Sequence, residues 1–239
     1  MVISKFFGLK ACFSTALALS FLLFGLPANG QVGLSGGYLN FKASDWLDAA
    51  GERTNKSIAS LAGWQVGADY WFRLQQKRVE FTVEANYSSY SESGLPSGNQ
   101  LEIAAYGLQL NTALYPLDFG SDCNCPTWSK SGDVFAKGFF IQLIAGGVYQ
   151  DKKLVSADFS SEQQDLALKL GAGIGLDIGI SDFFTVTPLV RYEYFPKLTW
   201  EGLATDTVGK DETTGNQIFA GIRLGFRFDE LYKYSIRSY

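Results

Sequence analysis

The residue types that most often carry catalysis are sparse in this sequence. The chain has 239 residues and no histidine, which removes Ser–His hydrolysis and histidine-based metal sites. Glu80 and Glu84 would be the acid and base of a carboxylate-only mechanism. Because both lie on one face of a predicted strand, an ion-pair network is the better interpretation. We therefore expect no enzyme activity and no cofactor.

Two cysteines separated by one residue are the other group with reactive side chains. Cys123 and Cys125 are compatible with a redox pair, a soft-metal ligand pair or a local disulfide. A metal site would need two more ligands, and the only other cysteine is Cys12. The sequence therefore favours a structural disulfide, or two thiols, that orders the long connection 116–137 in an oxidising compartment, with no metal.

The first thirty residues differ from the rest. Lys5 and Lys10 precede an apolar run at 16–26, and small residues follow at Ala28 and Gly30. This layout predicts a signal peptide, 1–30, that is cleaved before Gln31. A single anchor helix is the poorer alternative, since about 20 apolar residues are needed to span a bilayer and no basic cluster follows.

The charge of the remaining chain is acidic. Cleavage removes two lysines and no acids, which leaves 18 basic and 24 acidic residues and a net charge of −6. A nucleic-acid partner is therefore disfavoured.

Apolar and polar residues alternate along most of the remaining sequence, with the period of two that is typical of strands. The strongest run is 166–180, and similar runs cover 64–72, 79–87, 104–111, 139–146, 184–194 and 217–228. A first strand from Val32 to about Phe41 makes the number even, with a bulge expected at Gly36-Gly37. Pro188 interrupts the hydrogen-bonding capacity of the run 184–194. These runs predict an all-β domain, 31–228, of about eight antiparallel strands, and a tail, 229–239.

The polar face of these strands carries charges of both signs. They are five acids and four bases, namely Asp69, Glu80, Glu84, Asp177, Glu193, Lys169, Arg191, Arg223 and Arg227. On a solvated exterior the many glycines of this face would cost stability, whereas in a narrow lumen they leave room for long side chains. An eight-stranded barrel has space only for side chains, so we expect an ion-paired plug.

The rings of the apolar face fall into two groups at opposite strand ends. One group is Tyr70, Phe72, Phe81, Phe139, Phe184, Phe226 and Phe228, and the other is Trp64, Tyr87, Tyr149, Tyr192 and Tyr194. Aromatic bands of this kind mark the two interfaces of a membrane. Together with the alternation, they predict a closed up-and-down transmembrane β-barrel.

Connection lengths agree with this topology at all but one place. Long polar segments at 44–60, 91–100, 151–165 and 196–215 alternate with short turns at 73–78 and 181–182. Outer-membrane barrels have long external loops and short periplasmic turns, so the 116–137 connection is unexpectedly long. Loops 45–57 and 197–214 match no phosphate, calcium or nucleotide pattern, and we expect any protein partner to bind there.

With the strands placed, the chain resembles the small OmpA/OmpX-like family of porin-family outer-membrane barrels. The most specific similarity is the last strand, where Gly221, Leu224, Phe226 and Phe228 resemble the C-terminal signal of such barrels. The stretch 114–127 is similar to porin-family barrels as well. The resemblance implies a bacterial outer-membrane location, contacts with outer-membrane lipid and lipopolysaccharide, and recognition by the barrel assembly machinery.

The function expected from these features is non-enzymatic. It is a structural or adhesive role, or membership of a secretion or transport assembly in the envelope. Two alternatives remain open. One is a small-solute channel, and the other is a soluble periplasmic barrel that binds an apolar ligand with its apolar face turned inward.

Overall fold

The computed structural model describes residues 31–73, 78–92, 95–96, 98–118, 134–156, 158–181, 183–205 and 208–227. The expected signal peptide, Phe228, the tail 229–239 and both Cys123 and Cys125 lie outside the described residues. In chain order the elements are β1 (Gln31–Lys42), α2 (Ser44–Thr54), β2 (Leu61–Arg73), β3 (Val79–Ser91), β4 (Gln100–Leu114), the short 3-10 helix η1 (Pro116–Asp118), α3 (Val134–Gly138), β5 (Phe139–Ser156), β6 (Phe159–Leu176), β7 (Ile178–Ser181), β8 (Phe184–Thr199) and β9 (Glu212–Arg227).

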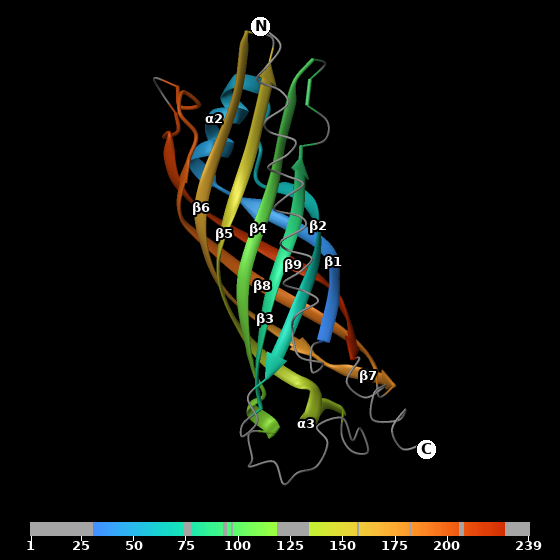
Figure 1. Ribbon diagram of the computed structural model, residues 1–239. Coiled ribbons are helices and arrows are strands. Elements are labelled where there is room, and N and C mark those ends of the chain that lie inside the picture. The colour runs from blue at the N-terminus through green and yellow to red at the C-terminus, as the bar shows by residue number, and fades with distance from the viewer. Residues whose placement is uncertain are drawn as a thin grey trace, which may run out of the picture.

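The strands form one closed antiparallel sheet. Strands β1 to β6 pair in chain order, as do β7 to β9, while β1 pairs with β9 and the pairing of β6 with β8 completes the ring. The short β7 continues β6, because Gly175 faces Leu189 and Ile178 faces Val186 in one unchanged register. The barrel therefore has eight strands, one of them interrupted at Asp177, and the predicted fold class is confirmed (Figure 1).

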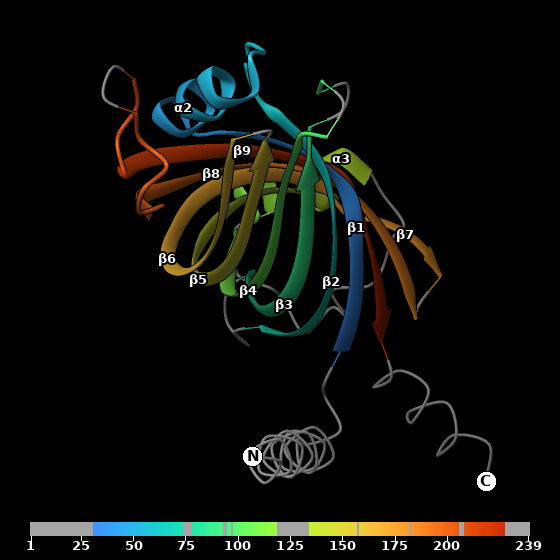
Figure 2. The same cartoon turned by 90° about the horizontal axis from the view of Figure 1, so that it is seen from above.

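The pairing also fixes the tilt of the strands. Starting at Phe41, successive paired residues lead through Gln217, Glu193, Gly171, Ile144, Asn111, Thr82 and Trp71 back to β1 at Gln31. One circuit is thus displaced by ten residues along β1. With strands about 4.8 Å apart and a rise of about 3.3 Å per residue, the strands tilt by about 40°. Such a barrel is narrow, and Figure 2 shows its strongly curved wall.

Apolar side chains point outward from this wall and polar side chains point inward. Leu108 and Leu168 on the outer face are 62% and 70% exposed, whereas Glu84 and Arg191 on the inner face are 0% and 1% exposed. This inside-out distribution is the one that a barrel needs in lipid. It excludes the alternative of a soluble barrel with an inward apolar face.

The first strand is more regular than its sequence indicates. β1 pairs with β2 and β9 through Gly36 and Gly37 with no register shift, so the expected bulge is wrong. A Cβ atom at Gly37 would lie 2.5 Å from the Ala220 carbonyl oxygen and 2.6 Å from Gly221 Cα. The glycine at position 37 therefore allows β1 and β9 to approach closely.

The two ends of the barrel differ. The loop end carries α2 and the connections after β3, β5 and β8, and the turn end carries the short turns, η1 and α3 (Figure 1). One of the long loops expected from polarity, 151–165, is almost entirely strand, and a second, 196–215, is shortened. β5 and β6 continue to Ser156 and Phe159, and β8 and β9 shorten the 196–215 segment to 200–211. The strand extensions at the loop end also alternate between the two faces, but both faces are rich in polar residues there. Polarity alone therefore suggested loops.

We predict that Leu143→Lys lowers the free energy of unfolding by about 2–4 kcal/mol, the cost of a charge near the bilayer midplane. Leu143 faces outward on β5 between the aromatic positions Phe139 and Tyr149. The matched control, Gln164→Lys, is exposed on the β6 extension at the loop end and should have almost no effect. The measurement is urea unfolding in phospholipid vesicles. Equal small effects at both positions would contradict the membrane placement.

Candidate functional site: the lumen and its lid

Two bidentate ion pairs cross the middle of the lumen. Arg191 on β8 donates from Nη1 and Nη2 to Oε1 and Oε2 of Glu84 on β3, at 3.1 and 2.8 Å. Arg223 on β9 donates from Nε and Nη2 to both carboxylate oxygens of Asp69 on β2, at 2.8 and 2.5 Å. Neither pair joins adjacent strands. They therefore bridge separate parts of the wall, and their paired geometry is the strong form of a charge-assisted hydrogen bond.

A third pair and several amides complete this polar layer. Lys169 Nζ lies 3.2 Å from Glu193 Oε2. Gln217 also donates to Glu193, and it accepts a hydrogen bond of 2.6 Å from the Tyr90 hydroxyl. Around Glu84, amide groups donate from Gln65 at 3.3 Å, Asn111 at 3.1 Å and Asn86 at 3.5 Å. Buried charges need such partners, because removal from water costs several kcal/mol per ion.

Two further predicted charges, Glu80 and Asp177, meet nearer the turn end. The Tyr115 hydroxyl lies 2.6 Å from Asp177 Oδ2 and 2.9 Å from Glu80 Oε2. Burial, then the carboxylates of Asp177 and Glu80, raise the pKa of this hydroxyl well above its ordinary value, so it stays a hydrogen-bond donor. The Arg78 guanidinium stacks 4.2 Å from the centre of the Tyr115 ring. A cavity of about 30 Å³ lies beside this group.

Asp177 differs from the sequence expectation in detail. It was placed inside one continuous strand, whereas it occupies the interruption between β6 and β7. Its Oδ1 accepts a hydrogen bond of 2.5 Å from the Thr187 hydroxyl, and its backbone N–H donates to the Gly138 carbonyl at 2.9 Å. The side chain of Arg227 lies outside the described residues. Of the nine predicted lumen charges, the structure thus joins six in pairs and gathers two at Tyr115.

Toward the loop end, the lumen becomes apolar and is covered by α2. The helix buries Trp46, Leu47, Ala49 and Ala50 in one cluster with inward residues of seven strands, Leu39, Phe41, Leu61, Tyr90, Leu101, Ile103, Leu154, Phe195 and Phe219. α2 is therefore a lid over the barrel. The 44–60 segment was expected to be a polar loop because Asp45, Asp48, Glu52 and Arg53 dominate its composition. The helical spacing of Trp46, Leu47 and Ala50 was the signal that could have identified it.

One arginine of the lid binds the connection between β8 and β9. Arg53 donates to the carbonyl oxygens of Gly202, Leu203 and Ala204 at 3.1, 2.8 and 2.9 Å. Its guanidinium also lies 3.7 Å from the centre of the Phe159 ring. The Arg53 side chain thus contacts three carbonyl oxygens of the β8–β9 connection and the ring of Phe159 at the start of β6. These contacts attach the lid to both segments.

A buried lysine lies beneath the lid. Lys152 Nζ is 4.5 Å from the Trp46 ring centre and 6.0 Å from the Trp200 ring centre, and the two indoles meet edge to face at 5.6 Å. The ammonium group also lies 3.5 Å from Asp165 Oδ2 and donates to the Thr199 carbonyl. Cation–π contacts are strongest when the cation is removed from water. Lys152 therefore joins α2, β5, β6 and the end of β8.

The aromatic residues of the outer face lie in two bands. Trp64, Tyr87 and Tyr106 form a row toward the loop end, with ring centres 5.5 and 5.1 Å apart. Toward the turn end, Phe72 stacks on Phe81 and Phe184 packs on Phe226. The other residues proposed for the bands, apart from Phe228, lie on the same outer face: Tyr70, Phe139, Tyr149, Tyr192 and Tyr194. Tyr38 and Tyr106, 55% and 57% exposed, were not included in the expected bands.

No cluster of three or more His, Cys, Asp or Glu residues is placed to hold a metal ion in the part of the chain that the structure describes. Glu84, one of the two carboxylates considered for acid–base chemistry, is bound by Arg191 and three amides. In the described ranges, no helix has the length and hydropathy to cross a membrane.

Comparisons with known proteins give structural resemblances only. No protein-family model and no curated protein sequence matches the chain. The structure is similar to neisserial surface protein A, NspA (12% identity, 83% of this chain and 97% of that chain, TM-score 0.46), and to Ail, the attachment invasion locus protein of Yersinia pestis (14%, 83% and 99%, 0.45). It is also similar to the outer membrane protein OprG of Pseudomonas aeruginosa (13%, 84% and 97%, 0.40).

The chain's own faces identify its environment. A closed antiparallel barrel with an apolar exterior, aromatic bands and a charged interior is the architecture of bacterial outer-membrane proteins. Closure satisfies the backbone hydrogen bonds that lipid cannot. The chain is an outer-membrane β-barrel, and its lumen is filled by its own side chains.

We predict that Arg191→Met lowers the free energy of unfolding by about 3–5 kcal/mol, because Glu84 remains buried without its partner. The double variant Glu84→Leu/Arg191→Met should recover most of this loss. Lys197→Ala is the control, since the Lys197–Glu212 pair is exposed on both sides and should contribute at most about 1 kcal/mol. Urea unfolding in vesicles measures all three. A double variant as unstable as Arg191→Met would contradict this account.

Proposed function

We propose that this chain is a non-enzymatic, non-conducting outer-membrane barrel that presents a folded surface at its loop end, for adhesion or for binding a partner protein of the envelope. The observation that carries the proposal is the double closure of the lumen. An ion-paired polar layer fills its middle, and an apolar cluster under α2 fills its loop end. Both layers occupy the space through which a solute would have to pass.

The alternative of a small-solute channel is disfavoured by the same layers. Solute passage would require separation of the Arg191–Glu84 and Arg223–Asp69 pairs, whose members are tied by two hydrogen bonds each. It would also require removal of α2, which Arg53 and the Trp46–Trp200 contact hold in place. Each separation would leave buried charges without their partners, which is costly.

Order at the loop end supports a recognition role. The α2 helix is bonded to the β8–β9 connection through Arg53, and Lys56, two residues after the helix, forms a 2.6 Å ion pair with Glu92 in the β3–β4 connection. Asn99 also donates to the Thr54 carbonyl at 3.2 Å. A surface ordered before binding loses less conformational entropy when a partner docks. Adhesion or partner binding therefore suits this end better than a transport function does.

Other partners belong to the proposal as well. The outward apolar face fits outer-membrane lipid and lipopolysaccharide, and the β9 residues Gly221, Leu224 and Phe226 fit recognition by the barrel assembly machinery. A nucleic-acid partner is disfavoured by the acidic net charge of −4 for the whole sequence.

Conductance in planar bilayers tests the closed lumen. We expect no stable channels from the wild type. Replacement of residues 45–57 by a short Gly-Ser linker should also give none, because the polar layer remains. Stable channels should arise only when this replacement is combined with alanine at all four members of the two bidentate pairs, Glu84, Arg191, Asp69 and Arg223. Large stable wild-type channels would refute the proposal and favour the small-solute alternative.

Photocrosslinking in living cells tests recognition at the loop end. A photoreactive amino acid at Asp48, exposed on α2, should give discrete adducts with a protein partner. The same amino acid at Leu143, on the lipid-facing side of β5, should give none. If positions 48, 201 and 210 all give no adduct in a correctly inserted barrel, the partner-binding part of the proposal fails.

A further inference from the structure

The seam between β6 and β8 is the shortest in the barrel. Leu170–Gly175 form six residue pairs with Leu189–Tyr194, and β7 adds three more beyond Asp177, whereas every other seam contains eleven or more. Pro188 lies next to one end of the stretch of β8 that pairs with β6, and Pro196 lies two residues beyond the other end. The two prolines therefore flank the β6 part of the seam.

The missing proline donors explain this limit. Successive residues of a strand bond alternately to the neighbours on either side, and positions 188 and 196 have the same parity. The β8–β9 register continues through Pro188, opposite Ile222, while the β6–β8 ladder ends at Leu189. The missing N–H groups therefore face β6. At the loop end, β8 also shifts register between Phe195 and Leu198.

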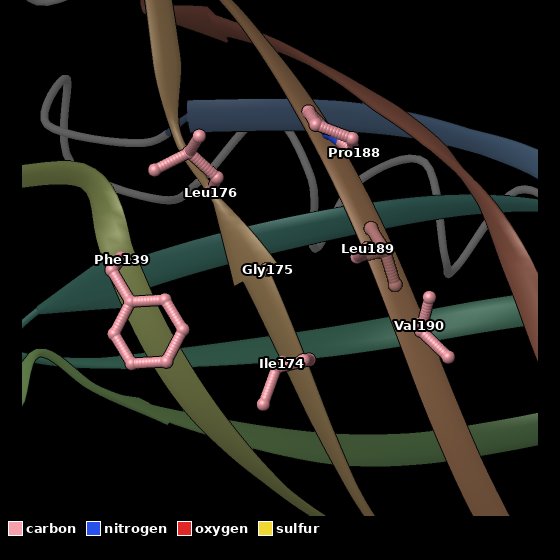
Figure 3. Close-up of a pocket in the computed structure, with 7 residues that line it drawn as sticks. All are labelled: Phe139, Ile174, Gly175, Leu176, Pro188, Leu189 and Val190. Carbon is pink, nitrogen blue, oxygen red and sulfur yellow. The ribbon is translucent and has the colours of Figure 1, made fainter. Parts of the chain in front are cut away.

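A groove lies on the outer face where the seam ends near Pro188. Its volume is about 290 Å³, and we call it the seam groove. Figure 3 shows Phe139 of β5 and Ile174 and Leu176 of β6 on one side, and Pro188 and Val190 of β8 on the other. Each of these side chains is hydrocarbon. The volume is close to the lower end of the range for ligand pockets, about 300–1,000 Å³.

The position of the groove determines what fills it. Ile174 and Val190 are about half exposed on the face that contacts lipid, and the groove continues that apolar surface. A charged or hydrogen-bonding ligand would lose its water without gaining a polar side-chain partner. A flexible hydrocarbon chain has no hydrogen bonds to water to lose, and it can fill the seam groove.

We propose that the seam groove binds one acyl chain of a membrane phospholipid, seated between β6 and β8 beside the interruption at Asp177. Leu189 lines both this groove and the small inner cavity, so it separates the acyl chain from the lumen. The bound chain shields the shortest seam at the place where its ladder is broken. This site requires only a barrel inserted in lipid and does not depend on a function for the loop end.

Photolabelling in a defined bilayer tests the site. The full chain is reconstituted in vesicles of phosphatidylethanolamine and phosphatidylglycerol that contain a phospholipid with a diazirine midway along one acyl chain. Adducts mapped by mass spectrometry should be several-fold more abundant at Ile174 and Val190 than at Leu143 and Ile222, which have similar outward exposure. An even distribution around the barrel would mean ordinary boundary lipid and would overturn the proposal.

A groove-filling variant provides the second measurement. Val190→Trp should abolish the excess labelling at Ile174, and Ile222→Trp, on the neighbouring β9, should preserve it. Heat-modifiable gel mobility shows whether each variant folds. If Val190→Trp does not fold, Ile174→Trp fills the other wall, with the excess then read at Val190. Undiminished labelling in a folded groove-filled variant would refute the site.

Discussion

The narrow cross-section of the barrel governs the rest of the structure. Eight strands displaced by ten residues per circuit leave room for side chains and little else. Every inward position must therefore either contribute to a packed interior or be a glycine that makes space for a larger neighbour. Gly33 illustrates the second case, because a Cβ atom there would lie 2.4 Å from the carboxylate of Asp69.

The interior meets this demand with two chemically different layers. The membrane-spanning middle uses Arg–carboxylate pairs, which cross the lumen because long charged side chains reach farther than aliphatic ones. The loop end uses an apolar cluster that no strand could close alone, and Trp46 and Leu47 of α2 complete it. Lys152 lies at the border of the apolar cluster. Its ammonium group contacts the rings of Trp46 and Trp200, and it also contacts the Asp165 carboxylate and the Thr199 carbonyl oxygen.

The fold was predictable from the sequence because lipid outside and charge inside impose a strict period of two. That period placed Glu84, Arg191, Asp69 and Arg223 on one face, but it carries no information on which acid meets which base. Which acid pairs with which base depends on how far each strand is displaced along its neighbour around the barrel. The alternation within one strand does not contain this information. The lid was missed because α2 buries a short apolar stripe within a polar segment, and the interruption at Asp177 depends on Pro188 of another strand.

The ion pairs join residues far apart in the chain, with Glu84 and Arg191 separated by 107 positions and Asp69 and Arg223 by 154. No hairpin of the barrel contains both members of either pair. A partly inserted sheet would therefore carry uncompensated charges into hydrocarbon, which is costly. Closure and insertion must then occur as one cooperative step, with the early strands kept hydrated until β8 and β9 arrive.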